Sequence, residues 1–162
     1  MKVPFINLNS RYQQYRKPFH KVLDEAIDSS QFILGQSLSR FESNLSKYIG
    51  TKYSIGVGNG TDALILGLKS LGIGPGDEVI TTPMSYLAST SSIYLTGAEA
   101  KFVDVGDDLN IDPLKVENVI SDKTKAILVV HLAGIPAKME RLKSVADENG
   151  LKLIEDCAQS IG

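Results

Sequence analysis

The chain has 162 residues, of which 43% are hydrophobic, and a formal net charge of −2, as expected for a single soluble domain with a core. This charge provides no basic field for nucleic acid or anionic membranes. The single cysteine excludes an internal disulfide, and no paired cysteines or histidine clusters indicate a metal site. The N-terminus contains neither a signal peptide nor a membrane helix, so we expect a cytoplasmic location.

The apolar pattern predicts helices and strands that alternate along the chain. An extended arm to residue 9 leads to a helix that is capped by Ser10, runs towards Ser29 and bends at Pro18. A second helix over 39–48 ends at Gly50. Strands are expected at 53–57, 78–81, 99–105, 124–130 and 151–155, and further helices at 61–71, 85–96, 112–120 and 136–149. This order favours an α/β fold with a mostly parallel sheet covered by helices.

The turn at 57–64, VGNGTDAL, joins the first expected strand to a helix through small residues. The free amides of the first helical turn lie just past Gly60, and Thr61 adds a hydroxyl, so a phosphate group can be held here without a lysine. Alternatively, Thr61 or Asp62 only caps its own helix. A dinucleotide fingerprint does not fit, because its third glycine falls at Thr61, and no Gly-Lys-Ser or Gly-Lys-Thr indicates a nucleotide P-loop.

A second polar group, EDCAQ at 155–159, follows the last expected strand. Ligands of open α/β sheets bind outside the carboxyl ends of the strands, so Asp156 is expected to face the same crevice as the Gly60 turn. A pyridinium N–H is a suitable partner for a buried carboxylate, and Gln159 can present its amide to the same ring. Taken alone, the acidic pair is more typical of a strand end that caps the next element.

Ordered motifs extend over the whole chain. They include VPFINL at 3–8, QFILG at 31–35, GTDAL at 60–64, GIGPGDEVI at 72–80, HLAGIPA at 131–137 and IEDCAQ at 154–159. In type and spacing they resemble the N-terminal part of the DegT-type (DegT/StrS) sugar-nucleotide aminotransferases, which are pyridoxal 5′-phosphate enzymes of fold type I. The resemblance implies an arm and first helices over 1–50 and a cofactor-binding α/β part of the large domain over 51–162. The small C-terminal domain is expected to lie outside this chain.

The resemblance also assigns roles to site residues. Residues 60–62 match the phosphate-binding turn, and Tyr86 matches the aromatic that stacks on the cofactor ring. Asp156 matches the aspartate that pairs with the pyridine nitrogen, and Gln159 matches the residue near the phenolic oxygen. The lysine that holds the cofactor as a Schiff base lies beyond Asp156 in the family, so no catalytic residue is expected among 1–162.

Two further polar residues lie near the expected crevice. His131 ends an apolar strand and belongs to a family motif, and its role stays open between a ligand contact and a buried structural histidine. Cys157 is expected to pack rather than react, because a negative neighbour such as Asp156 raises the pKa of a thiol.

The resemblance implies that the parent protein is an aminotransferase of amino-sugar and polysaccharide biosynthesis, and that this chain is an N-terminal fragment, inactive alone. The expected reaction moves an amino group from glutamate to a keto carbon of a nucleotide-linked sugar, in a homodimer. Two alternatives stay open: a dehydratase of the same family with histidine in place of the lysine, and a non-catalytic module for cofactor binding or dimerisation. Apolar faces that the absent strands would cover are expected to be exposed.

Overall fold

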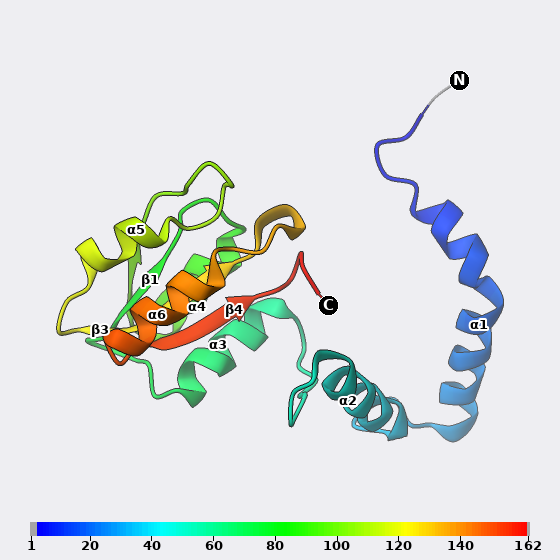
Figure 1. The fold of residues 1–162 in the computed structure, drawn as a ribbon. Coiled ribbons are helices and arrows are strands. Elements are labelled where there is room, and N and C mark those ends of the chain that lie inside the picture. Colours follow the sequence, from blue (N-terminus) through cyan, green and yellow to red (C-terminus); the bar gives the residue numbers. More distant parts are fainter. Residues whose placement is uncertain (1–2, 162) are drawn as a thin grey trace. The chain divides into compact units, whose positions relative to one another are not determined.

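The computed structural model describes residues 3–161 and divides the chain into two compact units, Met1–Gly56 and Val57–Gly162. The first unit is helical, and the second is a parallel sheet flanked by helices (Figure 1). The predicted α/β fold is therefore confirmed. Within residues 3–161, no helix combines the length and the apolar character needed to cross a membrane.

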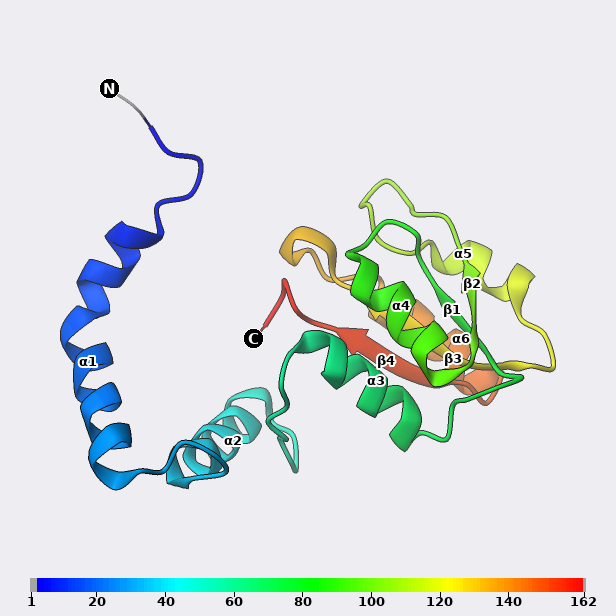
Figure 2. The same cartoon turned by 180° about the vertical axis from the view of Figure 1, so that it is seen from behind.

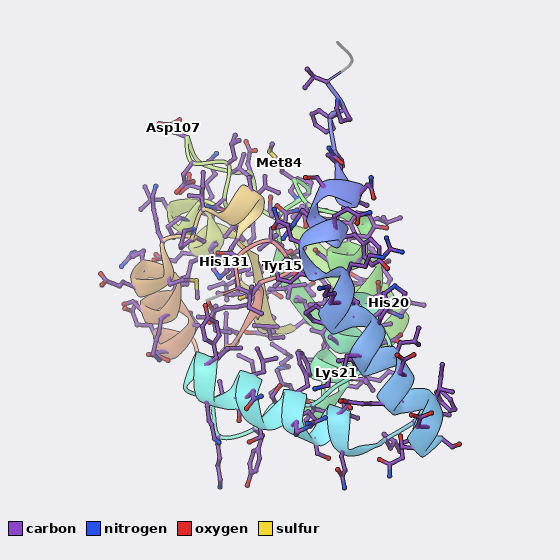
Figure 3. The ribbon with its side chains drawn as sticks, turned by 90° about the vertical axis from the view of Figure 1, so that its right-hand side faces the viewer. Tyr15, His20, Lys21, Met84, Asp107 and His131 are labelled. Carbon is purple, nitrogen blue, oxygen red and sulfur yellow. The ribbon has the colours of Figure 1, made fainter. Side chains whose placement is uncertain are left out.

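The N-terminal unit consists of α1 (Leu8–Ser29) and α2 (Gln36–Ile49). The predicted cap Ser10 is wrong: the Asn7 side chain caps α1 and accepts the Ser10 backbone N–H at 3.0 Å. The predicted end of α2 at Gly50 is confirmed, since Gly50 adopts the left-handed conformation with a φ of 80°. Neither helix has a buried residue, and α1 carries exposed side chains such as Tyr15, labelled in Figure 3.

The predicted strand at 53–57 is wrong. The segment has no strand pairing, and Tyr53 and Ile55 are 72% and 79% exposed. A strand needs a neighbour for its backbone hydrogen bonds, and the described residues offer none here. Instead, the Gly56 N–H donates to Glu42 Oε1 of α2 at 2.7 Å. The apolar residues of this segment and of α1, such as Ile55 and Phe19, are exposed.

The sheet of the second unit has the order β2-β1-β3-β4, and every neighbouring pair is parallel. Its strands are β1 (Glu78–Thr81), β2 (Glu99–Phe102), β3 (Thr124–Val130) and β4 (Lys152–Asp156). Parallel neighbours require crossover connections, which α4 (Leu87–Thr96) and α6 (Met139–Glu148) provide. The remaining elements are α3 (Gly60–Ser70), α5 (Pro113–Val116) and the 3₁₀ turns η1 (Glu117–Val119) and η2 (Leu132–Gly134).

Successive strand residues point to opposite faces, and the sheet therefore builds two cores. Ile80 and Ile127 pack with Leu142 of α6 on one face (Figure 1). Val79 and Leu128 pack with residues of α3 and α4 on the other face, which Figure 2 shows from behind. Every residue of β1 is buried, and the apolar run at 126–130 of β3 follows from this burial on both sides.

Three predicted elements are shorter in the structure. The strand expected to reach residue 105 ends at Phe102, and Val105 instead forms an isolated antiparallel bridge with Ile111. The helix expected over 112–120 is split into α5 and η1. The helix expected from residue 136 begins at Met139, because the backbone of Lys138, with φ −71° and ψ 68°, is not helical.

Candidate functional site

A cavity of ≈ 440 Å³ lies at the carboxyl ends of β3 and β4, where the helices α3 and α4 begin. This volume falls within the range of small-molecule sites, roughly 300–1,000 Å³. The predicted site residues that line it are Gly60, Thr61, Tyr86, Asp156 and Gln159. The other lining residues are Asn59, Leu64, Ser85, Ala88, Val130 and Ala158. Residues that are far apart in the sequence thus surround one space.

The N-terminus of α3 offers two free backbone donors to this cavity. Asn59 is the cap, and its backbone carbonyl accepts the Ala63 N–H at 3.1 Å. The structure gives the Gly60 and Thr61 amides no hydrogen-bond partner among residues 3–161. Together with the Thr61 hydroxyl and the positive end of the helix dipole, they form a site for an anion.

Asp62 does not line the cavity. Its backbone N–H donates to Asn59 Oδ1 at 2.9 Å, and its Oδ2 accepts the Asn59 Nδ2–H at 2.9 Å. The predicted phosphate-binding role of this amide is therefore not supported, since its proton is already used within the cap. The alternative cap residues Thr61 and Asp62 are also replaced by Asn59. The Asn-x-x-Asp spacing, a reciprocal capping pattern, is the sequence signal that finds Asn59.

Tyr86 is the residue before α4 rather than part of the helix. Its backbone is extended, with φ −65° and ψ 144°, and its side chain is 77% exposed. The ring lines the cavity and is free to cover a flat ligand. Offset stacking of two rings contributes roughly 0.5–1.5 kcal/mol beyond the burial of apolar area.

Asp156 is the last residue of β4 and is held at both carboxylate oxygens. Its Oδ1 accepts the Ala158 N–H at 3.1 Å, and its Oδ2 accepts the Ser89 hydroxyl at 3.0 Å. Among residues 3–161, no cationic side chain forms an ion pair with it. A fixed carboxylate without a counter-ion is suited to accept an N–H from a cationic ligand.

The amide of Gln159 is oriented by the loop that follows β3. Its Oε1 accepts the Ala133 N–H at 2.6 Å, so the oxygen faces η2 and the NH₂ group remains to donate. Ala133 has a φ of 53°, in the left-handed region that few residues other than glycine adopt. The loop conformation therefore determines which end of the amide is offered to a ligand.

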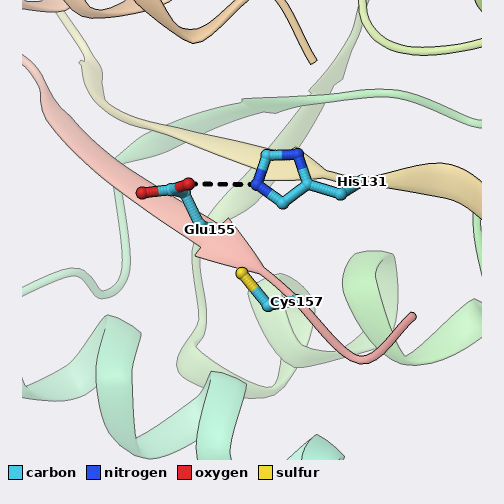
Figure 4. Close-up of side chains that lie close together, drawn as sticks. All are labelled: His131, Glu155 and Cys157. Carbon is cyan, nitrogen blue, oxygen red and sulfur yellow. Dashed lines mark hydrogen bonds and ion pairs between the residues drawn. The ribbon is translucent and has the colours of Figure 1, made fainter. Parts of the chain in front are cut away.

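His131 is buried and does not line the cavity. Its Nδ1 accepts the Ala137 N–H at 3.1 Å, so the ring proton is on Nε2, which donates to Glu155 Oε2 at 3.0 Å (Figure 4). Both ring nitrogens are thus used in holding the loop after β3 against β4. Of the two roles left open, the structural one fits this geometry.

The side chains of His131, Glu155 and Cys157 lie close together, with one potential metal-ligand atom of each within 4.8 Å of the others (Figure 4). The hydrogen bonds of His131 do not fit a metal site, because a ring that accepts at Nδ1 and is protonated at Nε2 has no lone pair left for a metal. Partial burial first, and then the charges of Glu155 and Asp156, raise the pKa of the Cys157 thiol. This direction agrees with the expected effect of a negative neighbour, but the side chain is exposed, so the prediction that Cys157 packs is wrong.

Three residues near the site were missed by the sequence analysis, namely Asn59, Ser85 and Ser89. Asn59 and Ser85 line the cavity, whereas Ser89 does not line it and donates a hydrogen bond to Asp156. Ser85 and Ser89 are four residues apart, and their hydroxyl oxygens are 2.7 Å apart. The spacing of four residues predicts that Ser85 and Ser89 are neighbours on a helix. The contact between Ser89 and Asp156, 67 positions later, has no local signal in the sequence.

Comparison with known proteins places the chain in a family. Residues 13–162 match the DegT/DnrJ/EryC1/StrS aminotransferase family. A pleiotropic regulatory protein of Geobacillus stearothermophilus is 45% identical over 100% of this chain and 44% of its own length. The dTDP-3-amino-3,4,6-trideoxy-α-D-glucose transaminase of Streptomyces venezuelae is 41% identical over 99% of this chain and 43% of its own length. The chain thus spans less than half the length of these relatives.

Solved structures agree with this assignment. The crystal structure of DesV from Streptomyces venezuelae has a TM-score of 0.97 and 41% identity, over 99% of this chain and 44% of that chain. The structure of NtdA from Bacillus subtilis, with bound pyridoxamine phosphate (PMP) cofactor, has a TM-score of 0.95 and 36% identity, over 99% and 38%. The chain belongs to the DegT/DnrJ/EryC1/StrS aminotransferase family, whose enzymes depend on pyridoxal 5′-phosphate.

Proposed function

We propose that the full protein is a pyridoxal 5′-phosphate-dependent aminotransferase that acts on a nucleotide-linked keto sugar, and that the cavity described here holds its cofactor. One observation carries the proposal. A single cavity is lined both by the two free amides at the start of α3 and by Asp156, whose carboxylate has no ion-pair partner among residues 3–161. A phosphorylated pyridine has an anion at one end and a ring N–H at the other. The names of the relatives, which include dTDP-sugar and UDP-sugar transaminases, support the substrate class.

The residues present fit this cofactor. The Gly60 and Thr61 amides would hold the phosphate, and Asp156 would keep a proton on the ring nitrogen. Tyr86 would cover one face of the ring, and the Gln159 NH₂ would donate to a ring oxygen. When bound, pyridoxal 5′-phosphate supplies an electron-withdrawing ring that stabilises the carbanion formed at the α-carbon of an amino donor.

The proton-transferring lysine is expected outside this chain. No lysine lines the cavity formed by the described residues. The lining residues would therefore bind and orient the cofactor, and none of them would transfer the substrate proton. We therefore propose that the 162-residue chain alone is inactive. Glutamate as the amino donor and a homodimer remain predictions of the family resemblance, and a cytoplasmic location remains a prediction from the N-terminal sequence.

The test uses the full-length protein with pyridoxal 5′-phosphate, glutamate and a nucleotide-linked keto hexose, and identifies the sugar product by mass. We expect an amino sugar, and Asp156→Asn should lower kcat about 100-fold, the loss typical of removing one fixed electrostatic contact. Asp147→Asn, on the exposed side of α6, is the matched control and should leave kcat unchanged. A deoxy sugar product would instead indicate the dehydratase. Unchanged turnover and cofactor affinity in Asp156→Asn would overturn the assigned role of this residue.

A further inference from the structure

We propose that Ser89 and Ser85 form a hydroxyl relay that positions the Asp156 carboxylate towards the cofactor cavity. Ser89 lies behind the carboxylate, whereas Ser85 lines the cavity itself. The inference deepens the proposed function and rests on it, because the relay acts on a ring nitrogen only through Asp156. Ser89 and Ser85 are positioning residues in this scheme, with no bond of their own to the reacting atoms.

The direction of the relay follows from the chemistry of its last member. A carboxylate only accepts, so the Ser89 hydroxyl donates its proton to Asp156 Oδ2, at 3.0 Å. The Ser89 oxygen then accepts from Ser85, whose hydroxyl oxygen is 2.7 Å away. Hydrogen bonds that donate in sequence polarise one another, most strongly where water is excluded. Ser89 is fully buried, so water does not compete for this contact.

Comparison with its own helix shows that the Ser89 contact is unusual. Hydroxyls within helices commonly bond to a carbonyl three or four residues earlier. Ser91, Ser92 and Thr96 of α4 all do so, to Ala88, Ser89 and Ile93 respectively. The Ser89 hydroxyl instead leaves α4 and reaches β4. Because the buried Ser89 hydroxyl bonds to the Asp156 carboxylate and not to a carbonyl of its own helix, it links α4 to β4 at the site.

The relay also explains how the carboxylate is kept from rotating. Ala158 holds Oδ1 through its backbone N–H, and Ser89 holds Oδ2 through its hydroxyl. Each carboxylate oxygen keeps a further lone pair, so the fixed plane can still accept one N–H from the cavity. Groups held in this way before a ligand arrives need no reorganisation on binding.

The experiment measures pyridoxal 5′-phosphate binding to the full-length protein by absorbance titration, and the ring-nitrogen chemical shift with ¹⁵N-labelled cofactor. Ser89→Ala should weaken cofactor binding about tenfold, the effect of a lost hydrogen bond to a charged group. It should also move the ¹⁵N shift towards that of an unprotonated pyridine. Ser85→Ala, which removes only the outer donor, should give a smaller change in the same direction and remains informative if Ser89→Ala misfolds.

Ser92→Ala is the matched control, because Ser92 is buried on the same helix and its hydroxyl bonds within that helix. We expect wild-type affinity and an unchanged ¹⁵N shift. A double-mutant cycle separates the relay from general packing: in the Asp156→Asn background, Ser89→Ala should cause no further loss. Equal effects of Ser89→Ala and Ser92→Ala, or additive losses in the cycle, would overturn the relay.

The same data distinguish failure of the relay from failure of the proposed function. If the wild-type protein binds the cofactor and Asp156→Asn weakens it, while Ser89→Ala and Ser85→Ala match the wild type, only the relay is rejected. If the wild-type protein does not bind pyridoxal 5′-phosphate, the relay and the proposed function are both rejected.

Discussion

The two units of this chain use their apolar residues in opposite ways. In the α/β unit, residues such as Ile127 and Leu128 are fully buried on the two faces of β3. In the helical unit, α1 and α2 have no buried residue, and Phe19 of α1 is 59% exposed. The difference shows that helical periodicity predicts an element without identifying what its apolar face contacts. The first unit has well-formed helices but, within residues 3–161, no core of its own.

The largest test of this comparison replaces one apolar residue in each unit of the 162-residue chain. Ile127→Ala should lower the free energy of unfolding by about 2–5 kcal/mol, because it leaves a cavity in a closed core. Phe19→Ala should change it by less than about 0.5 kcal/mol, as at other exposed sites. Urea unfolding followed by circular dichroism measures both. Equal losses would contradict the assignment of the core to the α/β unit alone.

A buried charge gives the second test. Glu78 is buried at the start of β1, where its carboxylate accepts the Ser121 hydroxyl at 2.6 Å and lies 3.2 Å from Lys101 Nζ. The Ser121 hydrogen bond is the largest cause of the lowered pKa of Glu78, followed among the lowering effects by Lys101. Because the pKa of Glu78 is lower in the folded than in the unfolded state, its ionised carboxylate stabilises the fold. This stabilisation is complete above about pH 4.3 and is lost as the pH falls through the folded-state pKa.

We therefore expect the wild-type chain to lose stability in acid, and Glu78→Gln to be less stable at neutral pH by about 1.5–3 kcal/mol and less sensitive to acid. Glu25→Gln, an exposed carboxylate of α1, is the control. Unfolding curves from pH 3 to 7 provide the measurement. A wild-type acid dependence that persists unchanged in Glu78→Gln would assign the effect to other groups.

The smallest test compares two asparagine caps whose side chains each accept the N–H of the residue three positions later. Asn59 accepts the Asp62 N–H at 2.9 Å, and Asn7 accepts the Ser10 N–H at 3.0 Å. Asn59→Ala should cost about 1 kcal/mol in the free energy of unfolding, the usual value for a lost cap. Asn7→Ala should fray α1 and leave the main unfolding transition unchanged, because α1 adds no buried residue. If both caps cost the same, α1 unfolds together with the sheet.

The parts of the fold that the sequence predicts are those with local causes. The apolar pair of β1, the apolar run of β3 and the glycine at the end of α2 act within a few residues, and these elements appear where the sequence predicts them. The segment 53–57 has the right alternation but no strand to pair with, and pairing is a property of distant residues. Residue type predicts Ser10 as the cap of α1, although Asn7 three positions earlier accepts the Ser10 N–H and caps the helix.

The candidate site also divides into features with a local sequence signal and features that depend on distant residues. Gly60, Thr61, Tyr86, Asp156 and Gln159 were assigned through motifs, and the structure brings them to one cavity. Two of the hydrogen bonds that orient them come from residues far away in the sequence. Ser89 fixes Asp156, and Ala133 fixes Gln159, across gaps of 67 and 26 positions. Such contacts depend on how the loops fold back on the sheet, which the residue pattern does not specify.

The position of β4 at the end of the sheet order has a practical consequence. Among residues 3–161, β4 pairs with β3 on one side only, so a row of its backbone N–H and C=O groups has no strand opposite it. Open strands of this kind recruit strands from other molecules and promote aggregation. A recombinant piece that stops at this point should therefore self-associate at high concentration. Any strand recruited there would lie alongside Asp156, the last residue of β4, and a dye-binding assay would detect the aggregates.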